Sequence, residues 1–398
     1  MRISTSAMHD LAIAALLRQQ AELSKTQNQI ATGKRVQKPS DDPVAAAQLF
    51  ELTRTQSQVE QFNRNSTAAT TRLQLEEQAL ADSGTVLQRV HELVVQSNTA
   101  TLTNSDRQYI VTELQARASE LQAIANRQDT NGDYLFAGFA ARTQPFARGS
   151  SGQVAYMGDS GARQLQVDSS QFVADANPGS QVFMDVTAGN GAFTTAAAAT
   201  NTGSGVLDAG SIVDRSQWVP DQYTISFTSG STWQVTDSAN NPVAAGSYTG
   251  DGAIAFRGVQ VNLSGTPASG DQFAVRPAGT QDVFGMLDGV IATLQAGAGN
   301  DATRAQMSTA LNASLQQIEQ ASDHLLAVRA SVGARLSVLG DADAARQDQS
   351  TDLATAVSGL QDLDYAAAVS KMSQQYVGLQ AAQQSYANIS KLSLFNYL

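Results

Sequence analysis

The chain has 398 residues, a formal net charge of -11, 42% hydrophobic and 6% aromatic residues, and no cysteine. Its acidic balance argues against general nucleic-acid binding, since phosphate contacts need clustered Lys and Arg. Without cysteine, neither a disulfide framework nor a thiolate metal site is possible. No apolar stretch reaches the roughly 18 residues of a membrane span, and no cleavable signal pattern opens the chain, so we expect neither membrane insertion nor a cleaved signal peptide.

The first predicted helix runs from about residue 6 to 32. Its apolar and glutamine side chains recur at steps of three and four, which is typical of a thin coiled-coil seam. Gly33 is a natural end for this helix, because glycine accepts the left-handed conformation. Residues 1–40 hold six basic and two acidic side chains, which fits either a distinct partner or a solvated flank. The proposed seam consists of Ile13, Leu16, Gln20, Leu23, Gln27 and Ile30.

An extended linker over residues 33–39 precedes a strong helix-start signal. Ser40, Asp41 and Asp42 supply capping and acidic side chains, and Pro43 suits the first helical position. The second helix is predicted to continue to about Gln96, and at that length it would span roughly 80 Å, too long for an ordinary globular core. We expect the buried face of this helix to consist of Leu49, Leu52, Val59, Phe62, Leu73, Leu80, Leu87, Leu93 and Val94.

A third helix is predicted from a cap at Ser105 or Asp106 to about Gln128. The dipeptide Asn131-Gly132 then favours a hairpin turn, because both residues tolerate positive φ. We expect a strand on its far side that carries Tyr134, Phe136 and Phe139. Short alternating runs separated by turn residues follow over 147–279 and indicate a sandwich-like or barrel-like β domain. Within it, residues 196–199 are expected to form a mobile loop.

Helical periodicity returns at Asp282, is interrupted at residues 297–300, and continues from Asp301 to about Leu360. After a break at residues 362–365, a last helix carries a second thin seam of Val369, Met372, Tyr376, Leu379, Gln383, Tyr386 and Ile389. The two terminal seams are weak, since Ala and Gln stand where a stable isolated coil has Leu. We therefore expect the ends to pair with each other or with a neighbouring subunit, and to remain unfolded until a partner is present.

The order helices, strands, helices predicts an α+β fold. It is a long antiparallel helical bundle, or coiled-coil rod, built from both chain ends, with an inserted β domain. We expect terminal coiled-coil helices over 1–40 and 361–398, a helical rod over 41–146 and 280–360, and the β domain over 147–279. The joint between the terminal helices and the rod is assigned to Gly33, Ser40, Asp41, Asp42 and Pro43.

No constellation of residues points to catalysis. His9, His91 and His324 lie on different helices, so a shared metal site is not expected. The pairs Glu76-Glu77 and Asp362/Asp364 are interpreted as solvated or capping carboxylates. No phosphate-binding, nucleophile-elbow or zinc-protease motif occurs. We predict a non-enzymatic protein with no cofactor and no metal.

Both ends of the chain resemble the flagellin superfamily. Residues 32–36 (TGKRV) with 40–43 (SDDP) resemble its N-terminal signature, which residues 62–65 (FNRN) continue. Residues 362–365 (DLDY) and 369–372 (VSKM) resemble its C-terminal region. Residues 131–138 (NGDYLFAG), Pro145-Phe146, and the end 385–387 and 392–395 are more similar to its hook-filament junction branch than to flagellin.

The resemblance implies a structural role in the bacterial flagellum. The terminal helices would form the inner layer of a tubular assembly, and the β domain would lie on its surface. Subunits would leave through the flagellar type III channel, escorted by a cytoplasmic chaperone on the C-terminal helix. The implied partners are flagellin, a hook-side junction protein, and further copies of the chain in a ring or helical layer, outside the cell.

Two other functions remain open on the sequence. Flagellin itself shares the terminal signatures, but the hairpin segment and the C-terminus disfavour it. A coiled-coil surface adhesin with a ligand-binding β domain would need a signal or an anchor, and neither is visible in the sequence.

Overall fold

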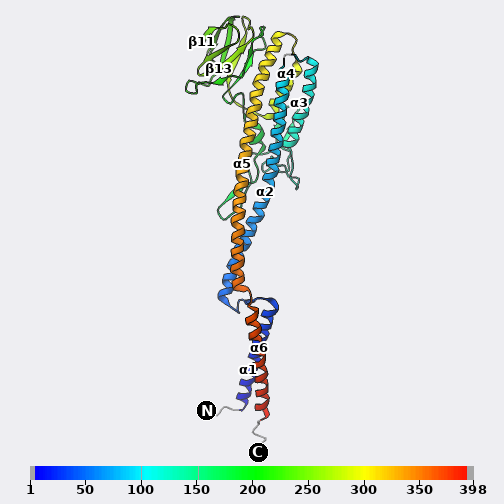
Figure 1. Cartoon of the computed structure of the whole chain (residues 1–398), viewed down its shortest axis with the longest axis vertical. Helices are drawn as coiled ribbons and strands as arrows, with labels where there is room; N and C mark the ends of the chain where they lie inside the picture. The colour runs from blue at the N-terminus through cyan, green and yellow to red at the C-terminus, as the bar shows by residue number, and fades with distance from the viewer. Residues whose placement is uncertain (1–4, 100, 151, 392–398) are drawn as a thin grey trace, which may run out of the picture. The chain divides into compact units, whose positions relative to one another are not determined.

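A computed structural model describes residues 5–99, 101–150 and 152–391 (Figure 1). The chain forms two compact units: a terminal unit of residues 1–64 and 341–398, and a central unit of residues 65–340. Helices from both chain ends flank an inserted antiparallel β domain, which confirms the predicted fold class. Among the described residues, no helix is long and apolar enough to cross a membrane.

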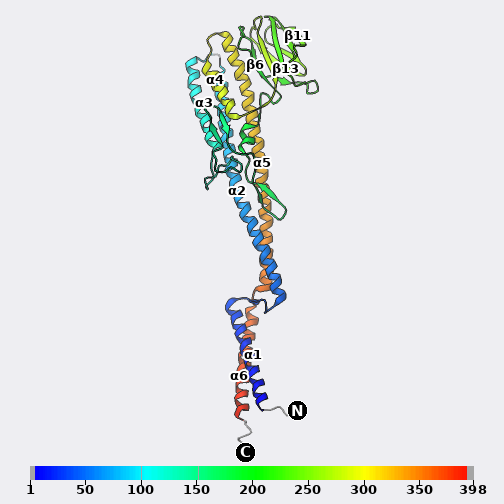
Figure 2. The same ribbon diagram turned by 180° about the vertical axis from the view of Figure 1, so that it is seen from behind.

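In the terminal unit, α1 (Thr5–Thr32) and α6 (Tyr365–Lys391) lie side by side (Figures 1 and 2). The unit also holds the start of α2 (Pro43–Ser97) and the end of α5 (Asp301–Gln361). These bounds confirm the helix end before Gly33, the start at Pro43 and the break before Tyr365. Val59 and Phe62 are buried on α2, and Arg346 Nε donates to Asn63 Oδ1 at 2.7 Å.

The central unit packs α2 and α5 with α3 (Asn104–Ala125) and α4 (Val283–Ala296). The cap of α3 is Thr103, which corrects the prediction of Ser105 or Asp106. Thr103 Oγ1 accepts from the Asp106 backbone N–H, and the Asp106 carboxylate accepts from the Thr103 backbone N–H, so the two residues form a capping box. Asp282 caps α4 through a bond from Gly285 N–H.

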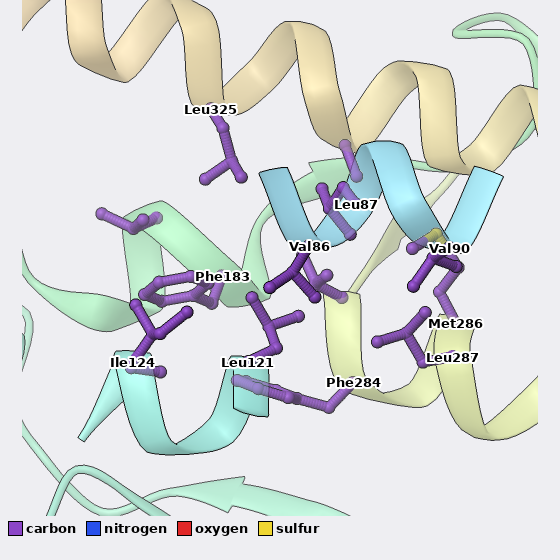
Figure 3. Close-up of a cluster of buried hydrophobic side chains, with 14 of the residues drawn as sticks. Val86, Leu87, Val90, Leu121, Ile124, Phe183, Phe284, Met286, Leu287 and Leu325 are labelled. Carbon is purple, nitrogen blue, oxygen red and sulfur yellow. The ribbon is translucent and has the colours of Figure 1, made fainter. Parts of the chain in front are cut away.

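Leucine and valine side chains fill the space between these four helices (Figure 3). Leu80 and Leu87 of α2, Leu121 of α3 and Leu325 of α5 are at most 1% exposed. Aromatic rings also belong to this core. The ring centroids of Phe183 and Phe284, for example, lie 6.0 Å apart. Truncation of one such leucine to alanine typically costs about 2–5 kcal/mol. The central unit therefore has a closed hydrophobic core of its own.

The strand predicted through Tyr134, Phe136 and Phe139 is wrong. Gly132 does turn the chain, with φ of 82°, but only an isolated bridge between Gln128 and Tyr134 follows. The reason is that Arg72 Nη2 donates to the Tyr134 carbonyl at 2.9 Å, so a side chain replaces the strand partner. Phe136 is fully buried and joins the helical core.

Two small antiparallel hairpins follow. They pair β1 (Phe146–Arg148) with β2 (Val154–Tyr156), and β3 (Gln164–Gln166) with β4 (Phe172–Ala174). A single turn of π-helix covers Ser180–Met184. Side chains from these hairpins and this turn belong to the core of the helices rather than to that of the β domain.

The β domain contains a five-stranded sheet in the order β11-β10-β9-β14-β6. It faces a smaller sheet in the order β12-β13-β7, with β8 also paired to β13, and a further pair joins β5 to β15. The strands are β5 (Val186–Thr187), β6 (Phe193–Ala197), β7 (Val206–Leu207), β8 (Ser211–Ile212), β9 (Tyr223–Ser229), β10 (Thr232–Thr236), β11 (Pro242–Ser247), β12 (Gly252–Phe256), β13 (Val259–Ser264), β14 (Gln272–Pro277) and β15 (Thr280–Gln281).

A second hydrophobic core holds the two sheets together. It includes Phe193, Tyr223, Phe227 and Phe273, each no more than 2% exposed. The expected mobile loop over residues 196–199 is wrong in its first half, because Ala196 and Ala197 belong to β6 and pair with β14. The residues of the second core begin near residue 190, and the three-part domain division stays a prediction.

Candidate assembly interface

The seam between α1 and α6 lies one residue away from half of the predicted positions. Six predicted seam residues are buried or half-buried, namely Leu16, Leu23, Ile30, Met372, Leu379 and Tyr386. The predicted members Ile13, Gln20, Gln27, Val369, Tyr376 and Gln383 are instead exposed. The seam is formed by Ala12, Leu16, Gln19, Leu23, Thr26 and Ile30 on α1, and by Ala368, Met372, Gln375, Leu379, Ala382 and Tyr386 on α6.

The seam between α1 and α6 buries little apolar surface. Alternate positions hold Ala, Gln or Thr, which bury little apolar area. Within the described part of the chain, Gln375 Oε1 is buried without a hydrogen-bond partner, a further cost to the pair. The helices approach closely at Gly378, where an added Cβ would lie 2.5 Å from Gln19 Nε2. Near the open end, His9 and Tyr386 stack edge to face at 5.9 Å.

Several large apolar side chains of the terminal helices face solvent. Ile13 is 42% and Tyr376 is 58% exposed. We call the solvent-facing residues Leu11, Ile13, Leu17, Val369, Tyr376 and Val377 the exposed apolar set. The side chain of Ile389, also predicted as an interface residue, lies outside the described residues. Exposed apolar groups on two paired helices are typical of a surface that is covered in an assembly.

The predicted joint at Gly33 is built from backbone bonds between the two chain ends. Gly33 adopts φ of 69°, and its N–H closes α1 on the Gln29 carbonyl at 2.9 Å. Leu363 N–H donates to Gly33 O at 2.9 Å, and Arg35 N–H donates to Gln361 O at 2.7 Å. These bonds form a short antiparallel bridge at Lys34 and Asp362. The positive φ favours glycine at this position, and a Cβ here would lie 2.9 Å from Tyr365 Oη, at the end of an exposed side chain.

Two adjacent aspartates hold the turn into α2. Asp41 pairs with Lys25 at 3.0 Å and accepts from the backbone N–H groups of Gln37 and Lys38. The Lys25 hydrogen bond is the first cause that lowers the pKa of Asp41, followed by these two N–H groups. Asp42 caps α2 through a 3.0 Å bond from Ala45 N–H, which lowers its pKa, and it pairs with Arg35 at 3.2 Å.

The two remaining joint residues take simpler roles. Pro43 is the first residue of α2, as predicted, and Ser40 lies in the turn before it. Arg35 adds a connection that the sequence did not indicate, because its Nη2 reaches the Leu360 carbonyl at 2.7 Å. One arginine thus links the linker, the start of α2 and the end of α5.

The three histidines lie in separate surroundings. His91 lies 3.8 Å from Glu319, and His324 Nε2 bonds to the Gln181 carbonyl at 2.8 Å. Over residues 5–99, 101–150 and 152–391, no group of three His, Asp or Glu side chains is arranged to hold a metal ion.

Glu76 is a buried carboxylate, which corrects the expectation that it is solvated. It is fully buried and accepts bonds from Asn177 N–H at 3.2 Å and Asn177 Nδ2 at 2.7 Å. Burial raises its pKa to about 7 against these two bonds. Arg72, one turn earlier, pairs with Asp129 at 3.0 Å and belongs to the same buried polar cluster. No local pattern signals this cluster, since its members come from distant segments.

Comparison with known families agrees with this arrangement. The family model "Bacterial flagellin N-terminal helical region" matches residues 3–141, and "Bacterial flagellin C-terminal helical region" matches residues 305–398. Between them, residues 196–277 match "Flagellar hook-associated protein 1, D2-like domain". The flagellin models thus cover the helical ends, and a hook-associated-protein model covers most of the β domain.

Relatives that match nearly the whole chain show which branch of the flagellin superfamily it resembles. Flagellar hook-associated protein 3 of Salmonella typhimurium is 28% identical over 396 residues, which is 99% of both chains. The crystal structure of FlgL from Xanthomonas campestris is 37% identical with a TM-score of 0.73, over 77% of this chain and 99% of that one. Hook-associated protein 3 from Legionella pneumophila is 32% identical with a TM-score of 0.74, over 78% and 98%.

These matches run through the helical ends and the β domain alike, whereas flagellin models match the ends alone. They favour the junction branch over flagellin, and they place the chain among structural components of the flagellum, outside the cell. The chain belongs to the FlgL (hook-associated protein 3) family of flagellar hook-filament junction proteins.

Proposed function

We propose that copies of this chain form a layer between a hook-side junction protein and flagellin, and that the terminal helices carry the contacts. The observation that supports this most strongly is the exposed apolar set. Six large apolar side chains on two weakly paired helices gain little inside the monomer. Each gains about 25 cal/mol per Å² of apolar area when a neighbouring subunit covers it. Contacts repeated around a layer add these small gains into a firm connection.

The weak seam supports a second part of the proposal, that α1 and α6 become fully ordered only in the assembly. Small and polar seam residues bury too little area to offset the entropy of ordering two long helices. We accordingly assign 1–40 and 361–398 to terminal coiled-coil helices, 41–146 and 280–360 to a helical rod, and 147–279 to a surface domain. Ordering at the growing end would prevent premature polymerisation.

The composition of the chain and the exposed residues of α6 also support a proposal for its export. The chain would pass unfolded through the flagellar type III channel, without a cleaved signal peptide, and the absence of cysteine avoids wrong disulfides on the way. A cytoplasmic chaperone would cover α6, whose Val369, Tyr376 and Val377 otherwise face water. The role is mechanical coupling, with no catalytic step, cofactor or metal.

Deletion of the gene in the source organism tests the junction role. We expect hooks without filaments in electron micrographs, with unpolymerised flagellin shed into the medium. Bare hooks with no flagellin in the medium would identify the chain as the filament subunit instead. Intact filaments would remove it from the structure.

A paired variant tests the exposed apolar set. Val369→Ser with Tyr376→Ser should abolish filaments while the thermal unfolding of the purified chain stays unchanged, since both side chains are already exposed. The matched control is Phe172→Ser with Val213→Ser, two exposed apolar residues of the central unit. Normal filaments in the first strain would contradict the proposed interface.

A further inference from the structure

The loop after the Asn131-Gly132 turn presents an aromatic ring to solvent on a fixed backbone. Phe139 is 67% exposed, yet its N–H donates to Asp159 Oδ1 at 3.0 Å. The same oxygen accepts from Gly161 N–H at 2.7 Å, and Gly161 lies directly under the Phe139 ring. Such a ring is preorganised, because little conformational freedom remains to be lost when a partner covers it.

Other groups lock the same loop. Gly138 has φ of 66°, and a Cβ there would lie 2.3 Å from the Asp159 carbonyl. The single hydroxyl proton of Tyr156 is shared between the carbonyls of Phe136 and Asp159, which lie 2.9 and 2.7 Å from Oη. Met157, two residues before Asp159, is also 58% exposed. A rigid exposed aromatic ring is typical of a binding hot spot rather than of a spacer loop.

A groove of about 620 Å³ lies elsewhere on the central unit, between α2 and α5. Leu80 and Leu325 form its buried floor, and the exposed Leu326 stands at its rim. Gly84 also lines it, and a Cβ at this position meets nothing within 4 Å. Glycine inside a helix costs about 0.5–1 kcal/mol relative to alanine, and no contact within the central unit requires one here. Open space above Gly84 leaves room for an inserted side chain.

Arg142 of the loop and the carboxylates of the groove have opposite charges, and the loop also holds Asp133 and Asp159. Arg142, three residues after Phe139, has a side chain 90% exposed and lies 3.7 Å from Asp133. The groove carries Glu319 and the exposed Asp323, while its one arginine, Arg329, already pairs with Glu77 at 3.0 Å. Complementary charge at the edge of an apolar contact fixes its register more than its affinity.

We propose that Phe139 of one copy inserts into the α2/α5 groove of a second copy, with Arg142 directed at Asp323. This inference rests on the proposed function and names the surfaces through which copies meet in the central unit. Knob and groove are different surfaces of the same chain, so the contact is heterologous and repeats around a ring or helix, as a layer requires. A self-complementary contact would stop at a dimer.

Cross-linking in assembled flagella tests the geometry directly, because the chain has no native cysteine. The full-length Thr143→Cys/Ser322→Cys variant places one thiol beside the knob and one in the groove. A short bis-maleimide should give a ladder of dimer, trimer and higher species. Each single variant should stop at a weak dimer or give none. In the matched control, Thr143→Cys/Ser119→Cys, the second thiol lies on the exposed side of α3, and no ladder is expected.

Substitutions then test the chemistry. In the two-cysteine background, Phe139→Ala should reduce the ladder at least tenfold, whereas Tyr109→Ala, which removes an exposed ring from α3, should leave it unchanged. Gly84→Leu fills the groove from within and should act like Phe139→Ala. Arg142→Asp or Asp323→Arg alone should weaken the ladder, and the two together should restore it.

The inference would be overturned by no ladder from the first pair, by an equal ladder from the control pair, or by a ladder that Phe139→Ala does not reduce. A ladder that contains flagellin in place of a second copy would also overturn it. The proposed function is tested separately, by counting filaments on the two-cysteine strain before cross-linker is added.

Discussion

The α1/α6 pair and the helices of the central unit are both built from long amphipathic helices, but they bury very different surfaces. In the central unit, Leu73, Leu80 and Leu87 repeat every seven residues on α2 and are completely buried. In the terminal unit, the corresponding seam alternates leucine with Ala, Gln and Thr. Several large apolar groups, such as Ile13 and Tyr376, face solvent instead. Helical periodicity is therefore no measure of independent stability.

The contrast gives each region a task. We propose that the leucine-filled core orders the central unit before assembly. We propose in the same way that the thin seam leaves the terminal helices only weakly paired until neighbouring subunits cover them. The joint at residues 33–43 lies within the terminal unit, where backbone bonds tie the two chain ends together.

The largest expected effect compares one leucine from each region. Leu80→Ala should lower the free energy of unfolding by about 2–5 kcal/mol, because it empties space in a closed core. Leu23→Ala, in the seam, should cost about 1 kcal/mol or less, since its surroundings can relax. Urea unfolding followed by circular dichroism measures both. Equal losses would mean that the seam is as firmly packed as the central core.

The stabilities of the central unit and of the joint should depend on pH in opposite directions. The pKa of Glu76 rises from 4.5 to about 7 on folding, so folded chains bind the proton more tightly than unfolded ones. Between these pH values, stability should fall as pH rises, by about 3 kcal/mol in all. Unfolding free energies of wild type and Glu76→Gln from pH 4.5 to 8 test this. An unchanged slope in the variant would assign the effect to another group.

The joint should respond at lower pH. Asp41 and Asp42 have pKa values below their ordinary value of 3.8 on folding. Their stabilisation is therefore complete above that value, and is lost as pH falls below it through the folded pKa values. Amide hydrogen exchange at Gln37, Lys38 and Ala45 reports the loss locally, apart from any change at Glu76.

Gly33→Val should impair assembly more than it impairs folding of the monomer. A β-branched residue at φ of 69° is strained, and its Cβ would approach Tyr365 Oη at 2.9 Å. We expect few or no filaments, with a melting temperature for the central unit close to wild type. Gly250→Val is the control, since it has φ of 90° but no neighbour within 4 Å. Normal filaments in the Gly33 variant would contradict the role of the joint.

The smallest effect is expected for Pro43→Ala. Alanine continues a helix well, and the Asp42 cap on Ala45 remains, so the unfolding free energy should change by less than about 1 kcal/mol. Loss of the fixed φ frees the turn before α2, so we expect shorter or fewer filaments, counted by electron microscopy. Filaments of wild-type number and length would show that Pro43 does not restrict the joint.

The sequence by itself determined the helices, their breaks and the family. Gly33, Pro43 and Asp282 mark element ends through local conformational preference, which needs no distant partner. The terminal motifs and the heptad leucines of α2 are likewise readable along the chain. The α+β order of helices, strands and helices followed from these local signals.

Tertiary structure decided which face of each helix is buried and which polar groups leave water. Periods of three and four allow two adjacent seams, and only the approach of α6 selects Ala12 over Ile13 on α1. Glu76 looks like any surface carboxylate until Asn177, far along the chain, reaches it. The strand expected at Tyr134 fails because Arg72 takes its carbonyl. Each of these outcomes depends on contacts between distant segments, which local pattern does not encode.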